Sequence, residues 1–359
     1  MITVAHVNEQ KGLRGGERQA SWLVRGLDKE GVKNIVIGRQ GEPFIAMHPE
    51  MDNLIRIPLP LRGELDLYTA YQLARLAKRH RIDIFHAHSS HAHGLAVLAT
   101  VFGAPARVVV SRRVNFMPKK HRLSRWKYHR AHRILCVSEV VHETLLAYGL
   151  PEERLKTVHS SVDMQRAMMP AVSRSSLGIP ENVPFLFSAG ALVSHKDHAR
   201  LLEAFARVKL RFPTAQLVIA GEGPLRKELE TQIQTLGLEK SVSLPGHCDE
   251  APGICRSADL YVSSSWSEGL GTSILEALAT GTPVVAAQAG GAAEMVVPGQ
   301  TGRLVPVRDT DALTEAIIAA LIEKDESLAL AEAGKGWVED KFSVSRMVMG
   351  TLETYRELV

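Results

Sequence analysis

The feature that most constrains the fold is an alternation of two patterns along the chain. Short runs rich in β-branched and aromatic residues alternate with longer segments of helical periodicity. This alternation is typical of parallel β-α-β units, in which helices cover both faces of a sheet. In the first half we expect strands at Thr3–Val7, Asn34–Gly38, Ile82–Ala87, Arg107–Val110, Ile134–Val137 and Leu155–His159. Helices are expected at Glu17–Glu30, Asp66–His80, His91–Phe102, His121–Arg130 and Val140–Tyr148.

The second half repeats the alternation after a break in composition. Residues Asp163–Pro184 contain three prolines and three serines with little periodicity, and we interpret them as a linker. Beyond it, strands are expected at Phe185–Ala189, Gln216–Ala220, Val242–Leu244, Leu260–Ser263 and Val284–Ala287. Helices are expected at Ala199–Leu210, Leu225–Leu236, Ser273–Ala279 and Asp311–Glu323, with a last amphipathic helix at Ser343–Leu358.

The predicted fold class is therefore α/β, with two facing Rossmann-like domains built on parallel sheets. We expect the first domain at residues 1–165 and the second at 166–342. A C-terminal helix, 343–359, is expected to cross back to the first domain. Ligands of such open sheets bind in a crevice beyond the carboxyl ends of the strands.

Composition excludes several classes of protein. Of 359 residues, 45% are hydrophobic and 23% are charged, as is ordinary for a globular chain. No run reaches the roughly 18 apolar residues of a membrane span, and the N-terminus resembles a strand rather than a signal peptide. The three cysteines lack CxxC spacing, which favours reduced thiols over a disulfide framework or a structural zinc. We expect a cytoplasmic protein with no metal and no cofactor.

The most informative motif lies between a predicted strand and the next one, at Ser265–Val285. It contains Glu268, Gly269, Gly271 and Glu276, followed by the helix stop Gly281-Thr282-Pro283. Glycines let the backbone approach a ligand, and the amides at a helix start suit a phosphate. A carboxylate one turn inside that helix can chelate two vicinal hydroxyls, which a ribose and a sugar both offer. The combination predicts a site for a nucleoside diphosphate sugar.

This segment resembles the EGxGxxxxE signature of the family 4 retaining glycosyltransferases, which have the GT-B fold. Further matching segments are Gly15-Gly16-Glu17, Asp83–His88, Val137-Ser138-Glu139, Ala220–Pro224 and Gly290–Glu294. At Ser160-Ser161 the family commonly has Asn-Gly. The resemblance therefore covers nearly the whole chain.

The resemblance implies a role for each matching residue. Glu276 would bind the ribose hydroxyls, Glu268 would hold sugar hydroxyls, and Lys196 would pair with the diphosphate. The amides of Gly269, Leu270, Gly271 and Thr272 would hold the distal phosphate. His88 would contact the donor sugar from the first domain, and Gly16 would let the first loop approach the reaction centre. The predicted catalytic residues are Glu268, Lys196 and His88.

Two further glutamates are candidates for the donor site, each with a structural alternative. Glu222 binds ligand or merely occupies a turn. Glu294 approaches the sugar or only caps the following helix.

One position departs from the family pattern. The family usually carries an Arg in a G-R-L turn before the Lys, and this chain has Gly190-Ala191-Leu192. Lys196 would then act more alone, or another cation would compensate. The candidates are Arg112, Arg113, His195 and His198.

A basic stretch marks the first domain. Between Ile84 and Ser138 there is no Asp or Glu, and the cations expected on the acceptor or membrane side are Arg112, Arg113, Lys119, Lys120, Arg125 and Lys127. Such a stretch attracts an anionic membrane surface, a phosphorylated acceptor or nucleic acid, or it is a solvated basic face. The segment Lys119–Arg133 could form an interfacial helix, or Trp126 could belong to the core. Nucleic acid is disfavoured, because aromatic stacks for RNA are absent.

These patterns predict transfer of a sugar from a nucleotide sugar, with UDP as the expected carrier, to a hydroxyl of a glycan or lipid-linked acceptor. Peripheral attachment to the inner face of the membrane is part of this hypothesis. The alternatives are a sugar-nucleotide epimerase on the same architecture and a non-catalytic sugar-nucleotide binder. A nicotinamide dehydrogenase is disfavoured, since no GxGxxG follows an early strand. A zinc site at His86, His88, His91 and His93 lacks a carboxylate or thiol, and we expect His86 to be a buried, hydrogen-bonded residue.

Overall fold

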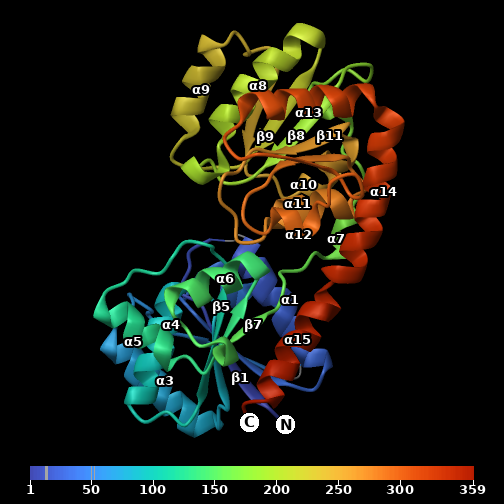
Figure 1. The fold of residues 1–359 in the computed structure, drawn as a ribbon. Helices are drawn as coiled ribbons and strands as arrows, with labels where there is room; N and C mark the ends of the chain where they lie inside the picture. The colour runs from blue at the N-terminus through green and yellow to red at the C-terminus, as the bar shows by residue number, and fades with distance from the viewer. Residues whose placement is uncertain (13–14, 50, 52) are drawn as a thin grey trace. The chain divides into compact units, whose positions relative to one another are not determined.

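Two parallel β-sheets organise the chain, one in each of two units (Figure 1). The computed structural model describes residues 1–12, 15–49, 51 and 53–359. The N-terminal unit comprises Met1–Ser161 together with Val344–Val359, and the C-terminal unit comprises Val162–Ser343. Leu13 and Arg14, next to the predicted glycine loop, lie outside the described residues.

The sheet of the N-terminal unit has seven strands in the order β3-β2-β1-β4-β5-β6-β7. Every pairing in it is parallel, as the alternating pattern predicted. The strands are β1 (Thr3–Val7), β2 (Lys33–Gly38), β3 (Leu54–Pro58), β4 (Ile84–Ala87), β5 (Arg107–Arg112), β6 (Arg133–Cys136) and β7 (Leu155–Thr157). The helices are α1 (Gly15–Lys29), α2 (Pro43–Ala46), α3 (Leu67–His80), α4 (Ser90–Val101), α5 (Arg122–Arg130), α6 (Glu139–Tyr148), η1 (Glu152–Arg154) and, at the end of the chain, α15 (Val344–Arg356).

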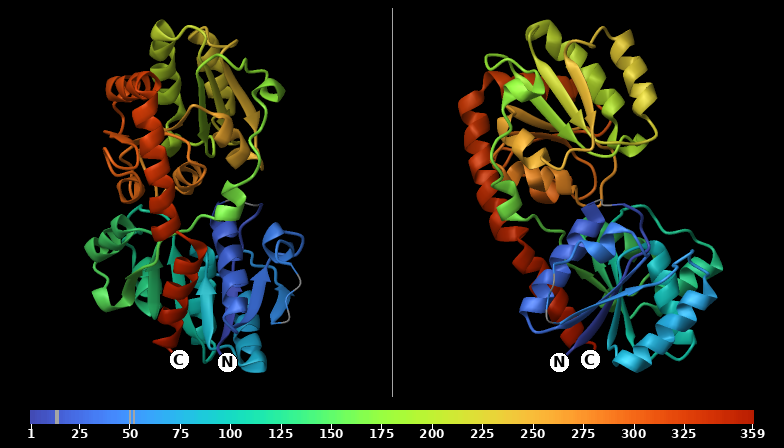
Figure 2. Two further views of the ribbon diagram at one scale, coloured as in Figure 1. Left: turned by 90° about the vertical axis from the view of Figure 1, so that its right-hand side faces the viewer. Right: turned by 180° about the vertical axis from the view of Figure 1, so that it is seen from behind.

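The C-terminal helix α15 is part of the N-terminal unit and packs against α1 (Figure 2). Its buried side chains Met347, Leu352 and Tyr355 join a core cluster with Leu23 and Leu27 of α1. A Cβ at Gly26 of α1 would overlap the side chain of Val348, so the glycine permits this close helix contact. The amphipathic face of the last segment is thereby buried.

The C-terminal unit has a six-stranded sheet in the order β10-β9-β8-β11-β12-β13, again parallel throughout. Its strands are β8 (Phe185–Ala189), β9 (Gln216–Ala220), β10 (Val242–Gly246), β11 (Leu260–Ser263), β12 (Val284–Ala287) and β13 (Arg303–Val305). Its helices are α7 (Met164–Ala167), η2 (Arg174–Leu177), η3 (Ser194–Lys196), α8 (His198–Arg211), α9 (Arg226–Thr235), α10 (Ala251–Ser257), α11 (Thr272–Ala279), α12 (Ala292–Met295), α13 (Thr310–Ile322) and α14 (Lys324–Lys341).

The predicted class of two parallel α/β domains is confirmed, and the differences concern elements with weak patterns. β3 is a half-exposed edge strand that ends in Pro58, so it lacks a buried hydrophobic run. The long helix α14 contains Gly334 and Gly336, which weaken a helical pattern. Gly334 is explained by packing, because a Cβ there would lie 2.8 Å from Leu278 of α11.

Among the described residues, no helix combines the length and the apolar character that crossing a bilayer requires. The three cysteines are free, and two of them, Cys136 and Cys255, are buried. Burial raises the pKa of the Cys136 thiol to about 12 and that of Cys255 to about 11, so both remain protonated at neutral pH. The prediction of unpaired cysteines is confirmed.

Candidate functional site

Each sheet reverses its strand order at one position, and the loops beyond that position form the candidate sites. In the C-terminal unit the reversal falls between β8 and β11, and in the N-terminal unit it falls between β1 and β4. Ligands of open α/β sheets bind outside the carboxyl ends of the strands at such a reversal. The loops that follow β8 and β11 carry Lys196 and Glu268, and His88 directly follows β4.

Lys196 and Glu268 meet at the reversal point of the C-terminal unit. The Nζ of Lys196 donates to Oε1 of Glu268 at 2.5 Å, and the two side chains are only 16% and 10% exposed. Ser265 Oγ donates to the same oxygen at 2.7 Å. The structure thus brings two of the predicted catalytic residues together as one ion pair in a poorly hydrated place, where charges act more strongly than in bulk water.

Hydrogen bonds between the two loops hold this pair in place. Ser264 Oγ donates to the backbone oxygens of Lys196 and Asp197, at 3.0 and 2.9 Å. Trp266 donates from its indole to Ser194 O and from its backbone to His195 O, each at 2.9 Å. The guanidinium of Arg308 lies 4.6 Å from the centre of the Trp266 ring. Lys196 is therefore positioned through both its backbone and its side chain.

Helix α11 starts beside this pair, as the sequence predicted. Gly271 is its N-terminal flanking residue, with φ at +103°, a left-handed conformation that favours glycine. At the other end, Gly281 has φ at +73°, and the amides of Gly281 and Thr282 donate to Leu278 O and Ala277 O. That pair of bonds is a Schellman motif, which confirms the predicted helix stop. The helix begins at Thr272, and the side chain of Leu270 just before it is buried.

Glu276 lies inside α11 and faces an arginine that the sequence analysis did not single out. Its Oε1 is 3.5 Å from Nε of Arg166, and the two side chains are about equally exposed, at 21% and 20%. Arg166 belongs to α7, within the segment predicted to be a linker with little periodicity. No motif pointed to this pair, because the residues are 110 positions apart in the sequence.

The two remaining donor-side candidates, Glu222 and Glu294, lie in different local structures. Glu222 is more than half exposed and pairs with Arg226 at 2.8 Å in the turn after β9, and this hydrogen bond lowers the pKa of its carboxyl. The alternative that Glu222 merely occupies a turn therefore has a direct structural basis. Glu294 is the third residue of the short helix α12, which Gly291 precedes.

The G-E-G-P turn has a packing role that residue matching did not reveal. A Cβ at Gly221 would overlap the carbonyl oxygen of Gly190, and a Cβ at Gly223 would overlap that of Leu192. The amide of Leu192 also donates to Glu222 O at 2.9 Å. The turn after β9 thus supports the loop that leads from β8 to Lys196.

Neither histidine near Ala191 supplies a cation at neutral pH. Burial lowers the pKa of His198 to about 4, and the Lys196 charge adds to this shift. Burial and the same lysine also lower the pKa of His195. The missing arginine of the Gly190-Ala191-Leu192 turn is therefore not replaced by either ring within this unit.

In the N-terminal unit, His88 belongs to a buried network that fixes its tautomer. Asn34 donates its amide hydrogens to backbone carbonyls, so its Oδ1 accepts from Nε2 of His6 at 3.1 Å. Burial lowers the pKa of His6 to about 3, so its Nδ1 is an acceptor. That atom lies 3.0 Å from Nε2 of His88, which must carry the hydrogen. The Nδ1 of His88 then accepts from Arg113, at 3.4 Å.

His86 occupies the same face and is fully buried, which confirms the expectation made for it. Its Nδ1 lies 2.5 Å from the Tyr355 hydroxyl of α15, and its Nε2 lies 2.8 Å from Ser111 Oγ. Burial lowers the pKa of both His86 and His88 well below the ordinary value. These rings are therefore neutral at physiological pH.

Arg113 lies between His88 and the glycine loop. Its Cδ would be 3.6 Å from a Cβ built on Gly16, and its Nη1 donates to His88 O at 3.4 Å. Burial lowers the pKa of Arg113 to about 10, and Glu17 opposes that shift. Arg113 is thus a half-buried cation at the β1–β4 reversal point, held against His88, and it is not fully exposed as a basic surface residue would be.

The other basic candidates differ from one another in their exposure and in their hydrogen-bond partners. Lys127 is buried and donates to Glu64 at 2.5 Å, so it does not belong to an exposed membrane or acceptor face as predicted. Arg112 donates to the Tyr128 hydroxyl at 2.8 Å. Lys119, Lys120 and Arg125 are exposed, and their place on an acceptor or membrane side stays a prediction.

The interfacial role of the segment Lys119–Arg133 stays a prediction, and its apolar residues differ in exposure. Leu123 is 43% exposed, and Phe116 and Met117 just before α5 are 51% and 45% exposed. Tyr128 and Ile134 are buried in the core, and Trp126 is half-buried beneath Arg130. The apolar part of this face therefore comes from residues 116–123 rather than from the whole segment.

One cluster of potential metal ligands occurs within the described part of the chain. It consists of His6, His86 and His88, whose ligand atoms all lie within 4.8 Å of one another. The rings already hydrogen-bond as described above, and the Arg113 cation beside them opposes a dication. His91 and His93 do not join the cluster: His91 faces Glu9 and His93 contacts Lys127 O. The expected lack of a metal stays a prediction.

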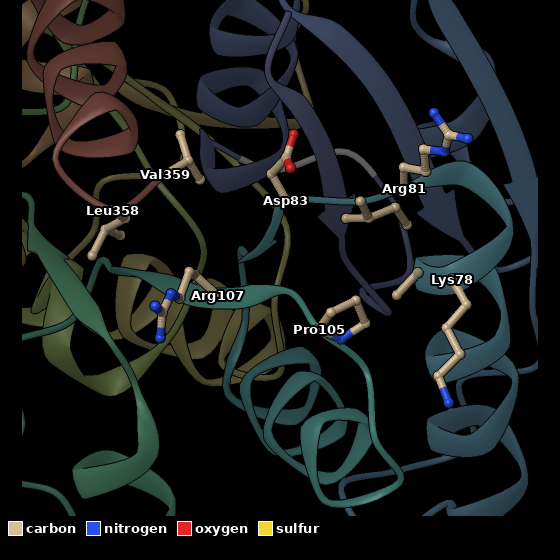
Figure 3. Close-up of a pocket in the computed structure, with 9 residues that line it drawn as sticks. Lys78, Arg81, Asp83, Pro105, Arg107, Leu358 and Val359 are labelled. Atoms are coloured by element: carbon tan, nitrogen blue, oxygen red, sulfur yellow. The ribbon is translucent and has the colours of Figure 1, made fainter.

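A hollow of about 590 Å³ opens at the other edge of the N-terminal sheet (Figure 3). Asp83 and Arg107, at the amino ends of β4 and β5, line it together with Lys78, Arg81 and Leu358. The Asp83 carboxylate already accepts from the Thr3 amide at 2.8 Å. The hollow lies away from the carboxyl ends of the strands, so it is not the crevice predicted for substrates.

Comparison with known families decides what kind of protein carries these sites. The family model described as Glycosyltransferase Family 4 matches residues 13–166, and the model described as Glycosyl transferases group 1 matches residues 171–337. The chain belongs to the family 4 glycosyltransferases. The predicted family is thus confirmed, and the two models meet within a few residues of the boundary between the units.

Two relatives of this family 4 chain are named for lipid substrates. The alpha-monoglucosyldiacylglycerol synthase of Streptococcus pneumoniae is 28% identical over 65% of this chain and 59% of its own length. The GDP-mannose-dependent alpha-(1-6)-phosphatidylinositol monomannoside mannosyltransferase of Mycolicibacterium smegmatis is 34% identical over 55% of this chain and 54% of its own. The chain therefore spans little more than half the length of these curated relatives.

Solved structures confirm the GT-B fold of this family member. HepE of Anabaena, determined in complex with UDP and glucose, matches with a TM-score of 0.86 over 99% of this chain and 100% of its own. The sucrose-phosphate synthase of Thermosynechococcus elongatus matches with a TM-score of 0.82 over 100% and 99%. The identities are 19% and 18%, so this likeness concerns the fold alone.

Proposed function

We propose that this chain is a retaining glycosyltransferase that moves a sugar from a nucleoside diphosphate sugar to a hydroxyl of a glycan or lipid-linked acceptor. The observation that carries the proposal is the Lys196–Glu268 pair, held at 2.5 Å at the strand reversal beside the start of α11. A cation, a carboxylate and a helix N-terminus together match the parts of such a donor. The cation suits the diphosphate, the carboxylate suits the hydroxyl-rich sugar, and the helix N-terminus suits a phosphate of the same diphosphate.

In this mechanism catalysis rests on neutralising the leaving diphosphate. Lys196 and the first amides of α11 stabilise the negative charge that develops as the bond to the sugar breaks. The acceptor hydroxyl attacks from the same face, and its proton passes to the departing phosphate oxygen. Glu268 holds sugar hydroxyls in preference to acting as a nucleophile. Its Oε1 already accepts from Lys196 and Ser265, and such bonds weaken a carboxylate nucleophile.

The solved structures and the named relatives differ in their donor nucleotide. We propose a UDP-linked sugar, supported by the likeness in fold to HepE, which was determined with UDP-glucose. The mycobacterial relatives are named GDP-mannose-dependent, so guanosine donors belong in any test. No cofactor is proposed, since the nucleotide sugar is itself a substrate.

For the acceptor we propose a lipid-linked or envelope glycan met at an anionic membrane surface, on its inner face. The support is the cluster of exposed Lys119, Lys120 and Arg125 beside the exposed apolar Phe116 and Met117. Cations next to apolar side chains are typical of interfacial binding. Replacement of Lys119 and Lys120 by Glu should weaken sedimentation with anionic vesicles several-fold. Equal binding of the native protein to neutral and anionic vesicles would contradict the membrane proposal.

The decisive experiment is a thermal-shift screen against sugar nucleotides and free nucleoside diphosphates, followed by a donor hydrolysis assay in which NMR reports the anomer released. A ligand that binds only the native state raises the unfolding temperature by mass action. We expect a shift with UDP and UDP-sugars and release of the sugar with retained configuration. A protein that no nucleotide stabilises would argue for a role other than transfer from a nucleotide sugar.

A further inference from the structure

The ion pair between Arg166 and Glu276 belongs to no motif of the sequence, yet it joins two parts of the candidate donor site. Arg166 Nε lies 3.5 Å from Oε1 of Glu276, and its Nη2 donates to the backbone oxygen of Asp249 at 2.7 Å. Glu276 is in α11, whereas Asp249 lies in the loop between β10 and α10. The helix α11 and this loop both come after the carboxyl ends of strands in the C-terminal sheet. One guanidinium therefore spans from the helix of the donor motif to a second loop at the same edge.

The backbone that carries Arg166 is itself fixed within the C-terminal unit. Asp163 caps α7 by accepting from the amides of Gln165 and Arg166. Just before the cap, the amide of Val162 donates to Phe342 O at 2.9 Å. After the helix, the amide of Val172 donates to Gly253 O of α10 at 3.0 Å. Anchoring on both sides means that the guanidinium is presented from a defined position.

The geometry of the guanidinium suits positioning more than direct binding. Its Nε makes no hydrogen bond to any described residue, so its contact with Glu276 is electrostatic. The hydrogen bond of Nη2 to Asp249 holds the planar group, and the charge then fixes where the carboxylate rests. Glu276 is 21% exposed, and the charge of the arginine orients its carboxylate without a hydrogen bond from Nε.

We propose that Arg166 is a positioning residue for the nucleoside end of the donor. It orients the Glu276 carboxylate toward the ribose hydroxyls and tethers the 247–250 loop at the same edge of the sheet. This inference rests on the proposed function, in which Glu276 binds the ribose. It adds a residue of α7, which belongs to the C-terminal unit although its sequence predicted a linker.

The test compares nucleotides that differ only in the hydroxyls concerned. Calorimetry on the full chain measures the affinity for UDP and GDP and for their 2′,3′-dideoxy forms, so that the ratio of the two affinities reports ribose recognition. We expect the native protein to prefer the ribose form by about a hundredfold, which corresponds to about 2.7 kcal/mol. Glu276→Ala should abolish the preference. Arg166→Gln should reduce it about tenfold, with little change in the dideoxy affinity.

Two further variants separate positioning from general stability. Arg166→Lys keeps a charge but not the planar fork, so we expect an intermediate preference. Arg174→Gln is the matched control, because Arg174 lies in the same segment and pairs with Asp259 at 3.0 Å instead. It should leave the ribose preference unchanged. In the double variant of Arg166 and Glu276, the arginine change should have no additional effect on that preference, as expected for a residue that acts through another.

The outcomes distinguish this inference from the proposed function. If Arg166→Gln keeps the native ribose preference, or weakens both forms of the nucleotide equally, the positioning role is wrong while the donor site stands. A native protein that shows no ribose preference with either base would overturn the Glu276 assignment, and the role of Arg166 with it. A rise in the donor KM with kcat unchanged would be the kinetic counterpart of the expected result, because the ribose is remote from the reacting bond.

Discussion

The two units place different chemistry at the same topological position. At the reversal of the C-terminal sheet lies an ion pair, Lys196 with Glu268, that remains partly exposed. At the reversal of the N-terminal sheet lie the neutral rings of His6, His86 and His88, which are buried and hydrogen-bonded to one another or to neighbours. The C-terminal reversal point therefore presents a close ion pair, and the N-terminal one presents a neutral histidine network with the Arg113 cation beside it.

The difference follows from what surrounds each set. The loops after β8 and β11 supply hydroxyl and backbone partners that tolerate charge, such as Ser265. Around the histidines, burial and the neighbouring Arg113 both oppose protonation. The same β-α-β topology thus provides two electrostatic environments, and the side chains after the strands decide which one forms.

The largest expected difference between the two units is the loss of stability at acidic pH. Burial lowers the pKa of His6 and His93 to about 3 and that of His48 to about 4 in the N-terminal unit. In the C-terminal unit, burial lowers the pKa of His198 to about 4. Below pH 6.5 the unfolded chain binds protons that these native histidines reject, so stability falls as the pH is lowered toward the native pKa values. At pH 5 each such group costs about 2 kcal/mol.

Hydrogen exchange at pH 7 and pH 5 measures this asymmetry unit by unit. We expect protection in the N-terminal sheet to fall first and furthest. Replacement of the exposed His247 by Gln serves as the control and should leave the pH dependence unchanged. Earlier loss of protection in the C-terminal sheet would contradict the predicted difference between the units.

Removal of the charge should affect catalysis more than any change in the neutral network. Lys196→Ala eliminates the cation next to the proposed diphosphate, and we expect kcat to fall about a thousandfold, or about 4 kcal/mol in activation free energy. Lys240→Ala, at an exposed site of the same unit, is the control. Steady-state kinetics with saturating donor makes the measurement. A variant with native turnover would show that a different cation serves the leaving group.

The smallest expected effect concerns the neutral network and its link to the C-terminal helix. Tyr355→Phe removes the hydroxyl that lies 2.5 Å from His86 Nδ1 and leaves a buried nitrogen without that partner. We expect a loss of about 2 kcal/mol in the free energy of unfolding, measured by denaturant titration. Tyr68→Phe, at a site 58% exposed, should change it by much less. Identical stabilities for the two variants would mean that the Tyr355 contact contributes nothing.

Sequence reasoning succeeded where local pattern and local structure coincide. The strand at Leu260–Ser263, the helix start at Thr272 and the stop at Gly281 follow from runs and glycines within a few residues. It failed where the explanation lies far away in the chain. Lys127 has the sequence context of a surface cation, but Glu64 and the helices around it bury the charge.

The sequence by itself determined the fold class and the family and singled out Lys196, Glu268 and Glu276 as candidates, because periodicity and compact motifs are properties of neighbouring positions. Only the tertiary structure decided which of these residues meet. It paired Lys196 with Glu268 across 72 positions, set Arg166 against Glu276, and joined His6 to His88 through a hydrogen bond that fixes a tautomer. Such contacts depend on which strand ends lie side by side in a sheet, and strand order is not written in the spacing of residues along the chain.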